Sequence, residues 1–387
     1  MKKTLRVAVV IPKYGLTGGA ENFVAELTGR LAQNTGYEFH VLANQWTAGT
    51  TNIRYHKIPI ISFPKFLTTI SFAYFVERTI SKMDFDLIHT HDRIFNADIY
   101  TMHGIPHRIW IHEVRGKKRL SLFDWGTAWV EKTLVGNERC RKFLAVSKLT
   151  RDKFLQEYGE VSDNRIEILH PGIDITRFQK YDRERCRKDI RERFSIGQDE
   201  IILLFVSMNF DIRGLDLLIN GLACLKQKRP TAKIRLLAVG KGDEKKYRLL
   251  ARNLGIEEWI VLTGVADTET LEKIYLAADL FSILSQFDTF SMAVLEAMAA
   301  SLPVIISSNV GAKDLIRQGV NGFIIDETGN LNSIANKIEL LLDGSVRQKM
   351  AAEAFQTASL QTWSAAVRKM EGIYSQIIKD RNSACGR

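Results

Sequence analysis

The chain has 387 residues, of which 45% are hydrophobic and 25% are charged, values that are ordinary for a soluble globular protein of about two domains. The formal net charge of +10 suits an anionic substrate or surface. The four scattered cysteines form no C-x-x-C pair, which argues against a disulfide framework or a zinc knuckle. No apolar run is long enough to span a membrane, and the N-terminal run VAVVIP is too short for a signal peptide, so we expect a cytoplasmic protein.

The first half of the chain alternates between continuous apolar runs and helical patterns. Continuous apolar runs are typical of strands that are covered on both faces in a parallel sheet. They predict strands at 5–11, 37–43, 86–90, 97–102 and 142–146, with helices between them, for example over 20–32 and 148–158. This half is therefore expected to be an α/β domain.

A second alternating series begins near residue 200 and runs to the C-terminal region. The stretch ILHPGIDITRF and the charged segment after it indicate an interdomain hinge. The pattern predicts an α/β fold of two doubly wound, Rossmann-like domains that face each other across a cleft. We place them at 1–175 and 176–360, and we expect a C-terminal amphipathic helix within 361–387 that returns to the first domain.

Three predicted helix starts favour an anion. Backbone N–H groups at a helix N-terminus attract phosphate, and glycine lets the backbone approach it. Gly18 and Gly19 precede the first helix, although a tight turn explains them equally well. Arg213 precedes a helix of the second half and has the fork geometry for a diphosphate, although an arginine in this position is more often a solvated surface charge. The amides of 290–292 (Phe290, Ser291 and Met292) begin another helix.

Two carboxylates lie in the apolar segment SQFDTFSMAVLEAMAASLP. Asp288 is expected in a loop and Glu296 on an alanine-rich helix that packs on the sheet. A buried carboxylate is tolerated when hydrogen-bond donors meet it. A ribose diol would supply two donors to Glu296, and a hexose would supply hydroxyls near Asp288. The alternative is a helix-start acid at Asp288 and an exposed Glu296.

This segment resembles the E-x7-E signature of the retaining GT-B glycosyltransferases of family 4. The resemblance extends over nearly the whole chain, through GGAE, HTHD, TMHG, AVSK, HPGID, RGLDLL and AADLF. Within the family it is most similar to bacterial enzymes that add a hexose to the lipopolysaccharide core, of the glucosyltransferase I type. It implies a nucleotide-sugar donor, with UDP-glucose expected, held by the second half and a lipid-linked glycan acceptor held by the first. It also implies retention at the anomeric carbon and a reaction without a metal or cofactor.

The resemblance assigns a role to each candidate residue. Glu296 would hold the ribose and Asp288 the hexose, with the amides of 290–292 beside it. Arg213, helped by Gly18 and Gly19, would hold the diphosphate. His103 matches a histidine near the donor sugar, and Val265 would lie by the base. The chain departs from the family at Asp288, where glutamate is usual, and at Met208, near which many members have an arginine.

The segment 105–129 combines basic and aromatic residues, which suits the anionic headgroups of a membrane. We expect peripheral association with the inner face of the cytoplasmic membrane and no nucleic-acid partner. The alternative is that this segment is a solvated loop whose tryptophans belong to the hydrophobic core. His89 and His91 form an H-x-H pattern without matching ligands downstream, so no metal site is predicted. Two other functions remain open: a sugar-nucleotide 2-epimerase of the same fold, and a non-catalytic membrane or nucleic-acid binding protein.

Overall fold

The computed structural model describes residues 4–16, 18–47, 49 and 52–385. It divides into two compact units, Met1–Gly172 with Trp363–Arg387 (unit 1) and Ile173–Thr362 (unit 2). The domain boundaries expected at 175/176 and 360/361 lie beside these limits. The outermost residues of the predicted ranges, 1–3 and 386–387, lie outside the described residues.

Unit 1 is built on a parallel sheet of seven strands in the order β5-β3-β1-β6-β7-β8-β9. The strands are β1 (Leu5–Val10), β3 (Tyr37–Ala43), β5 (Ile53–Lys57), β6 (Leu87–Thr90), β7 (Ile99–Met102), β8 (Lys142–Ala145) and β9 (Ile166–Ile168). The five predicted strands are confirmed as β1, β3, β6, β7 and β8. The sequence missed β5 and β9, the two edge strands, because partly exposed edges lack a continuous apolar run.

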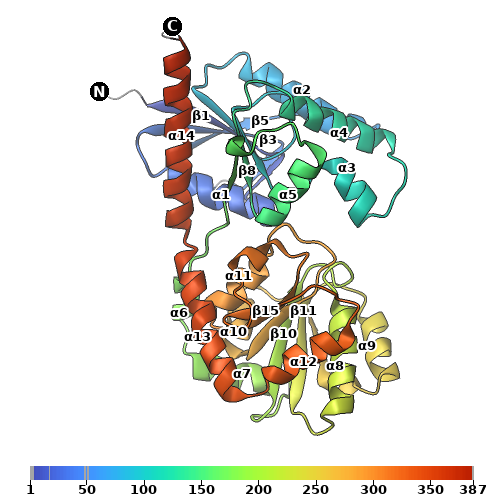
Figure 1. The fold of residues 1–387 in the computed structure, drawn as a ribbon. Coiled ribbons are helices and arrows are strands. Elements are labelled where there is room, and N and C mark those ends of the chain that lie inside the picture. The colour runs from blue at the N-terminus through green and yellow to red at the C-terminus, as the bar shows by residue number, and fades with distance from the viewer. Residues whose placement is uncertain (1–3, 17, 48, 50–51, 386–387) are drawn as a thin grey trace. The chain divides into compact units, whose positions relative to one another are not determined.

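Helices cover this sheet, as Figure 1 shows. They are α1 (Gly19–Leu31), α2 (Leu67–Ile80), α3 (His107–Ile109), α4 (Leu122–Val135), α5 (Lys148–Glu157) and α14 (Trp363–Cys385). Short elements are β2 (Lys13–Tyr14), β4 (Gln45–Trp46), η1 (Trp110–Val114) and η2 (Asp163–Arg165). The C-terminal helix α14 packs beside α1, and its buried residues Met370 and Tyr374 share a core with Val7 and Leu27.

Unit 2 has a parallel sheet of six strands in the order β12-β11-β10-β13-β14-β15. The strands are β10 (Ile201–Ser207), β11 (Ile234–Gly240), β12 (Ile260–Gly264), β13 (Leu280–Ile283), β14 (Val304–Ser307) and β15 (Gly322–Ile325). The chain fills one side of β10 first and then crosses to β13, so the strand order reverses between these two strands. Ligands of doubly wound sheets bind at such a reversal, beside the carboxyl ends of the strands.

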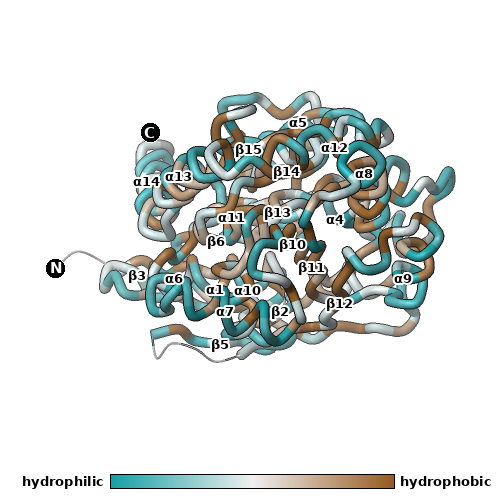
Figure 2. The backbone as a smooth tube through the Cα atoms, turned by 90° about the horizontal axis from the view of Figure 1, so that it is seen from below, coloured by the Kyte–Doolittle hydropathy of each residue, from teal (hydrophilic) through white to brown (hydrophobic). Residues whose placement is uncertain are grey.

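The helices of unit 2 alternate with its strands and place hydrophobic residues against the sheet. They are α6 (Thr176–Gln179), α7 (Arg183–Arg193), α8 (Leu215–Lys228), α9 (Glu244–Asn253), α10 (Thr268–Ala277), α11 (Met292–Ala299), α12 (Leu331–Leu340) and α13 (Gly344–Leu360), with η3 (Glu257–Trp259) and η4 (Gly311–Leu315). Figure 2 shows brown, hydrophobic stretches in the strands and mixed teal and brown along the helices. The predicted doubly wound α/β class is therefore confirmed for both units.

The charged segment that was expected to be a hinge belongs to unit 2. Its helix α7 is anchored by Arg187 and Arg191, which donate to the two oxygens of Asp279 over 3.1 and 3.2 Å. Arg191 also donates to the Glu200 carbonyl over 2.9 Å, and its side chain is 2% exposed. Two of the charges in this segment, Arg187 and Arg191, thus form ion pairs with the turn before β13, which the local sequence does not reveal.

Candidate functional site

The reversal point of unit 2 is formed by the loops after β10 and β13. These two loops are joined by backbone hydrogen bonds, from the Leu284 amide to the Arg213 carbonyl over 3.1 Å and from the Gln286 amide to the Ile212 carbonyl over 2.9 Å. Arg213 and the loop that carries Asp288 are therefore held side by side, although they are far apart in the sequence.

Gly214 makes this close approach possible. It precedes α8 in a left-handed conformation with φ of 75°, which costs glycine little. A Cβ atom at this position would overlap the Leu284 carbonyl oxygen. Position 214 therefore requires glycine, because any side chain there would separate the two loops.

Asp288 and Arg213 form an ion pair between Oδ2 and Nη1. The Asp288 side chain is 8% exposed and that of Arg213 is 29% exposed. Arg213 also lies 3.4 Å from the hydroxyl of the buried Ser285. Burial lowers the pKa of Arg213 to about 10, so the guanidinium remains protonated at neutral pH. The two residues to which the sequence assigned separate ligand groups thus contact each other.

The loop between Asp288 and α11 is also internally bonded. The Asp288 amide donates to the Asn309 carbonyl over 2.9 Å, and the Phe290 amide lies 3.3 Å from Asp288 Oδ1. Of the three amides at 290–292 that are expected to face a ligand, that of Phe290 thus has a hydrogen-bond partner in its own loop. Ser291 precedes α11 with a φ of 76°, and Met292 begins the helix.

Glu296 lies on α11, as predicted, but it is not a bare carboxylate among apolar neighbours. Arg177 Nη1 donates to Glu296 Oε1 over 2.9 Å, and the hydroxyl of the buried Tyr275 donates to Oε2 over 3.0 Å. Burial and the negative charge of Glu296 raise the pKa of Tyr275 well above its ordinary value, so the hydroxyl remains a donor. The Glu296 side chain is 17% exposed, which leaves it neither fully buried nor free in solvent.

Sequence reasoning missed the partners of Glu296. Arg177 and Tyr275 come from α6 and α10, and Arg177 also donates through Nε to Glu272 Oε1 over 2.8 Å. Glu272 receives further hydrogen bonds from Tyr181 Oη over 3.0 Å and forms an ion pair with Lys180 at 2.9 Å. The only available signal was the basic residue just after the HPGID motif, which is too weak a pattern to identify a partner 119 positions away.

In unit 1, His103 follows β7 and is partly buried. Its Nε2 lies 3.0 Å from His91 Nδ1, and its ring packs edge-on against Phe23 at 4.9 Å between centroids. His89, which is in ring contact with His91, bonds the Tyr374 hydroxyl of α14 over 2.8 Å. Burial lowers the pKa of His103 and of His89 to about 3, so both are neutral at physiological pH.

Gly18 and Gly19 stand at the start of α1, where the Gly18 carbonyl accepts from the Asn22 amide over 3.0 Å. Glu21 lies in the first turn, and a Cβ atom on Gly18 would overlap its carboxylate. This negative charge opposes the attraction of the helix N-terminus for a phosphate. Val265 follows β12 in unit 2 and is 63% exposed, so its side chain is available for contact with a ligand.

The basic and aromatic segment of unit 1 forms α3, η1 and the start of α4. Trp125 is 62% exposed and Leu122 is 76% exposed, and Phe63, which precedes α2, is 87% exposed. Lys65 lies 5.3 Å from the Phe123 ring, which brings the segment before α2 beside α4. Four basic residues of the preceding loop are also exposed: Arg115, Lys117, Lys118 and Arg119. In the described part of the chain, no helix is both long and apolar enough to cross a membrane.

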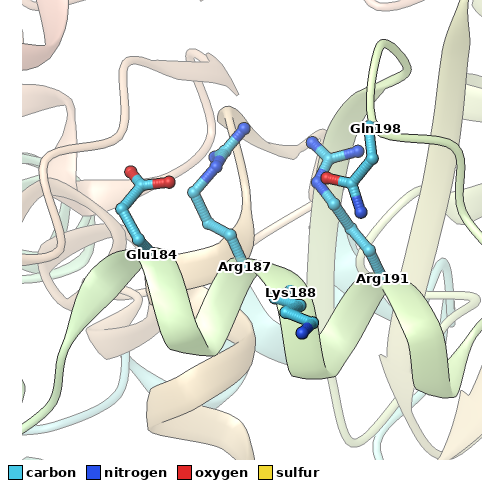
Figure 3. A pocket seen from close by; sticks show the side chains of 5 residues that line it. All are labelled: Glu184, Arg187, Lys188, Arg191 and Gln198. Carbon is cyan, nitrogen blue, oxygen red and sulfur yellow. The ribbon is translucent and has the colours of Figure 1, made fainter.

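A polar pocket of about 530 Å³ lies along α7. Figure 3 shows the side chains that line it: Glu184, Arg187, Lys188, Arg191 and Gln198. Arg187 and Arg191 are committed to Asp279 and to backbone carbonyls, which gives them a structural role. Within 4–16, 18–47, 49 and 52–385, no group of three or more His, Cys, Asp or Glu residues could hold a metal ion.

Comparison with known proteins identifies two family models. Residues 17–177 match the model described as Glycosyltransferase Family 4, and residues 187–357 match Glycosyl transferases group 1. The mannosylfructose-phosphate synthase of Agrobacterium fabrum is 28% identical over 204 residues, which are 51% of this chain and 44% of that protein. The chain thus spans less than half of that relative.

Two solved structures have the same fold. WaaG, a glycosyltransferase involved in lipopolysaccharide biosynthesis, superposes with a TM-score of 0.79 at 20% identity, over 95% of this chain and 99% of WaaG. HepE of Anabaena, solved in complex with UDP-glucose, gives 0.73 at 17% identity, over 96% and 100%. At these identities the likeness establishes the two-domain fold that the sequence predicted.

Proposed function

We propose that this chain is a glycosyltransferase that transfers a hexose from a nucleotide-diphosphate sugar to a lipid-linked glycan, because glycosyltransferase family models match both of its halves and its fold is of the GT-B type. UDP-glucose is the first candidate donor, and lipopolysaccharide core or another cell-envelope polysaccharide is the proposed pathway. The observation that carries the proposal is the ion pair of Arg213 and Asp288 at the strand reversal of unit 2, with Glu296 on α11, the helix that follows Asp288 in the chain. A cation for phosphate and two carboxylates for hydroxyl groups are what a nucleotide sugar requires.

We assign the donor contacts as follows. Arg213 binds the diphosphate, Glu296 accepts hydrogen bonds from the ribose, and Asp288 accepts hydrogen bonds from the hexose. The exposed Val265 packs against the base. His103 of unit 1 would contact the sugar as a neutral hydrogen-bonding group. Gly18 and Gly19 would contact phosphate through their amides, against the opposing charge of Glu21.

We propose that the reaction retains the anomeric configuration and needs no metal or other cofactor. Arg213 and the amides at the start of α11 would stabilise the charge that develops on the leaving diphosphate. Turnover should then be unchanged when the chelator EDTA is added, and NMR of the product should show the anomeric configuration of the donor. A strict requirement for a divalent cation would contradict this part of the proposal.

We also propose that the enzyme works at the inner face of the cytoplasmic membrane. Exposed Phe63, Leu122 and Trp125 beside the basic loop 115–119 give the combination of apolar and cationic side chains that binds anionic lipid. Co-sedimentation with phosphatidylglycerol vesicles should exceed that with phosphatidylcholine vesicles and should fall in Trp125→Ala. Leu360→Ala, which removes an exposed leucine of unit 2, is the matched control. Equal binding to both vesicles would contradict the proposal.

The function is tested by incubating the protein with a panel of nucleotide sugars and truncated lipopolysaccharide acceptors, with mass spectrometry of the acceptor. A mass gain of one hexose supports transfer, and Glu296→Ala should abolish it. Release of nucleoside diphosphate only when acceptor is present separates transfer from epimerisation. Calorimetric binding of the nucleoside diphosphate, lost in Glu296→Ala, separates an enzyme of this type from a non-catalytic membrane protein. No gain of mass with any donor would count against the proposal.

A further inference from the structure

The guanidinium of Arg177 links two carboxylates of different character. Its Nε donates to Glu272 over 2.8 Å, and its Nη1 donates to Glu296 over 2.9 Å. Burial opposes the charge of Arg177, but the charges of Glu296 and Glu272 outweigh it and raise the pKa of Arg177. Arg177 is therefore a permanently charged bridge between α10 and α11.

Glu272 acts as the fixed end of this bridge. Its side chain is 4% exposed, and it is also bonded by Tyr181 and Lys180. Burial opposes ionisation, but these hydrogen bonds and that of Arg177 hold the pKa of Glu272 below its ordinary value. Glu272 would keep two partners if Arg177 were removed, so the local structure does not depend on Arg177 alone.

Glu296 is the free end of the bridge. Arg177 occupies one site on Oε1 and Tyr275 occupies one on Oε2, so the plane of the carboxylate is fixed from both sides. A carboxylate accepts about four hydrogen bonds, and each oxygen of Glu296 therefore keeps capacity for one more. Two neighbouring acceptors held in one plane match the two hydroxyl groups of a ribose.

We infer that Arg177 is a positioning residue for ribose recognition, which holds Glu296 so that it accepts from the 2′- and 3′-hydroxyl groups of the donor nucleotide. The inference rests on the proposed function, because it takes Glu296 as the ribose contact. Arg177 itself touches no substrate in this arrangement. It sets how strongly the protein distinguishes ribose from deoxyribose.

The test compares each of UDP, ADP and GDP with its 2′-deoxy counterpart by calorimetry on the full chain. For the base that binds best, the wild type should prefer the ribonucleotide by roughly tenfold or more, the range for one charge-assisted hydrogen bond. Arg177→Gln should reduce this preference to about twofold and leave the affinity for the deoxynucleotide nearly unchanged. In Arg177→Gln, the KM for the nucleotide-sugar donor should rise, while kcat should change little.

The controls separate positioning from folding. Arg177→Lys restores a cation without the fork and should recover part of the preference. Lys180 pairs with Glu272 and not with Glu296, so Lys180→Ala should keep the full preference for the ribonucleotide. Tyr275→Phe removes the donor to Oε2 and should lower the preference independently, so the inference stays testable if thermal unfolding shows that Arg177→Gln is misfolded.

The outcomes are distinguishable. Equal losses of affinity for both nucleotides in Arg177→Gln and in Tyr275→Phe, or an undiminished preference in both, would overturn the inference while the proposed function stands. A wild type that binds a nucleoside diphosphate without preferring ribose would remove the assigned role of Glu296 and the inference with it. A wild type that binds none of the three pairs would overturn the proposed function as well.

Discussion

The carboxylate of Asp288 is ion-paired with the guanidinium of Arg213. The pair lies where the loops after β10 and β13 meet, and the Asp288 side chain is buried. If Arg213 binds the donor diphosphate, the phosphates compete with Asp288 for the same cation. The proposed sugar contact and the proposed phosphate contact are therefore coupled through this ion pair.

Asp288→Asn should separate these two roles. The substitution keeps the shape of the side chain but removes its charge, so Arg213 becomes fully available to phosphate and the repulsion between carboxylate and phosphate disappears. We expect the affinity for UDP, measured by calorimetry, to rise by about threefold to tenfold, because electrostatic coupling of this kind is on the order of 1 kcal/mol. We expect turnover to fall, because the hexose loses a charged acceptor and faces a neutral amide, in which an NH2 donor replaces one of the two oxygens.

The matched control for this experiment is Asp216→Asn, in the first turn of α8, which removes a nearby carboxylate that is not paired with Arg213. Asp216→Asn should change neither the affinity for UDP nor the turnover by more than a small factor. A parallel loss of UDP affinity and turnover in Asp288→Asn would contradict the competition between Asp288 and phosphate.

Gly214→Ala should destabilise unit 2 and disturb the site. The residue has a positive φ, and the added methyl group would overlap the Leu284 carbonyl oxygen. We expect a loss of about 1–3 kcal/mol in the free energy of unfolding, measured by denaturant titration, and weaker binding of UDP. Gly255→Ala shares the positive φ but meets open space, so its smaller effect isolates the steric contribution. Equal effects of the two substitutions would show that the contact with Leu284 is unimportant.

Asp279→Ala should destabilise unit 2 more strongly. Asp279 neutralises Arg187 and the buried Arg191, and it accepts from the Ile202 amide over 2.8 Å. Removing one partner of a buried ion pair costs about 3–5 kcal/mol, because the remaining charge is left uncompensated. Thermal unfolding should show a large decrease in Tm. Asp189→Ala, which removes an exposed carboxylate from the same helix α7, should leave Tm unchanged within error.

The stability of unit 1 should fall as the pH decreases from neutrality. The folded-state pKa of His89 is about 3, against an ordinary value of 6.5. Between these values the unfolded chain binds a proton that the folded chain does not, so folding loses stability as the pH falls below about 6.5. His103 has the same lowered pKa and adds to the effect.

His89→Gln tests this dependence, because glutamine can still bond Tyr374 and Thr101 but does not titrate. We expect the decrease in Tm between pH 6.5 and 5 to be smaller in the variant than in the wild type. His112→Gln, which replaces an exposed histidine, should retain the wild-type slope. A slope that is identical in His89→Gln and the wild type would contradict the assignment.

The sequence was sufficient for the features that depend on local pattern. Strands buried on both faces appear as uninterrupted apolar runs, which is why β1, β3, β6, β7 and β8 were predicted close to their limits. The place of Glu296 on an alanine-rich helix and of Asp288 in the preceding loop follows from the same reasoning, because helix and loop signals lie within a few residues. The edge strands β5 and β9 carry no such signal and were missed.

The partners of the candidate site residues came only from the folded chain. Arg177 meets Glu296 across 119 positions of sequence, and Arg213 meets Asp288 across the strand reversal of unit 2. Parallel strands joined by crossovers bring their carboxyl ends to one edge, so loops far apart in the chain become neighbours. A short-range pattern contains no information on which distant charge will arrive beside a given carboxylate. The chemistry of each side chain was readable from its own segment, whereas its pairing depends on the order in which the strands assemble.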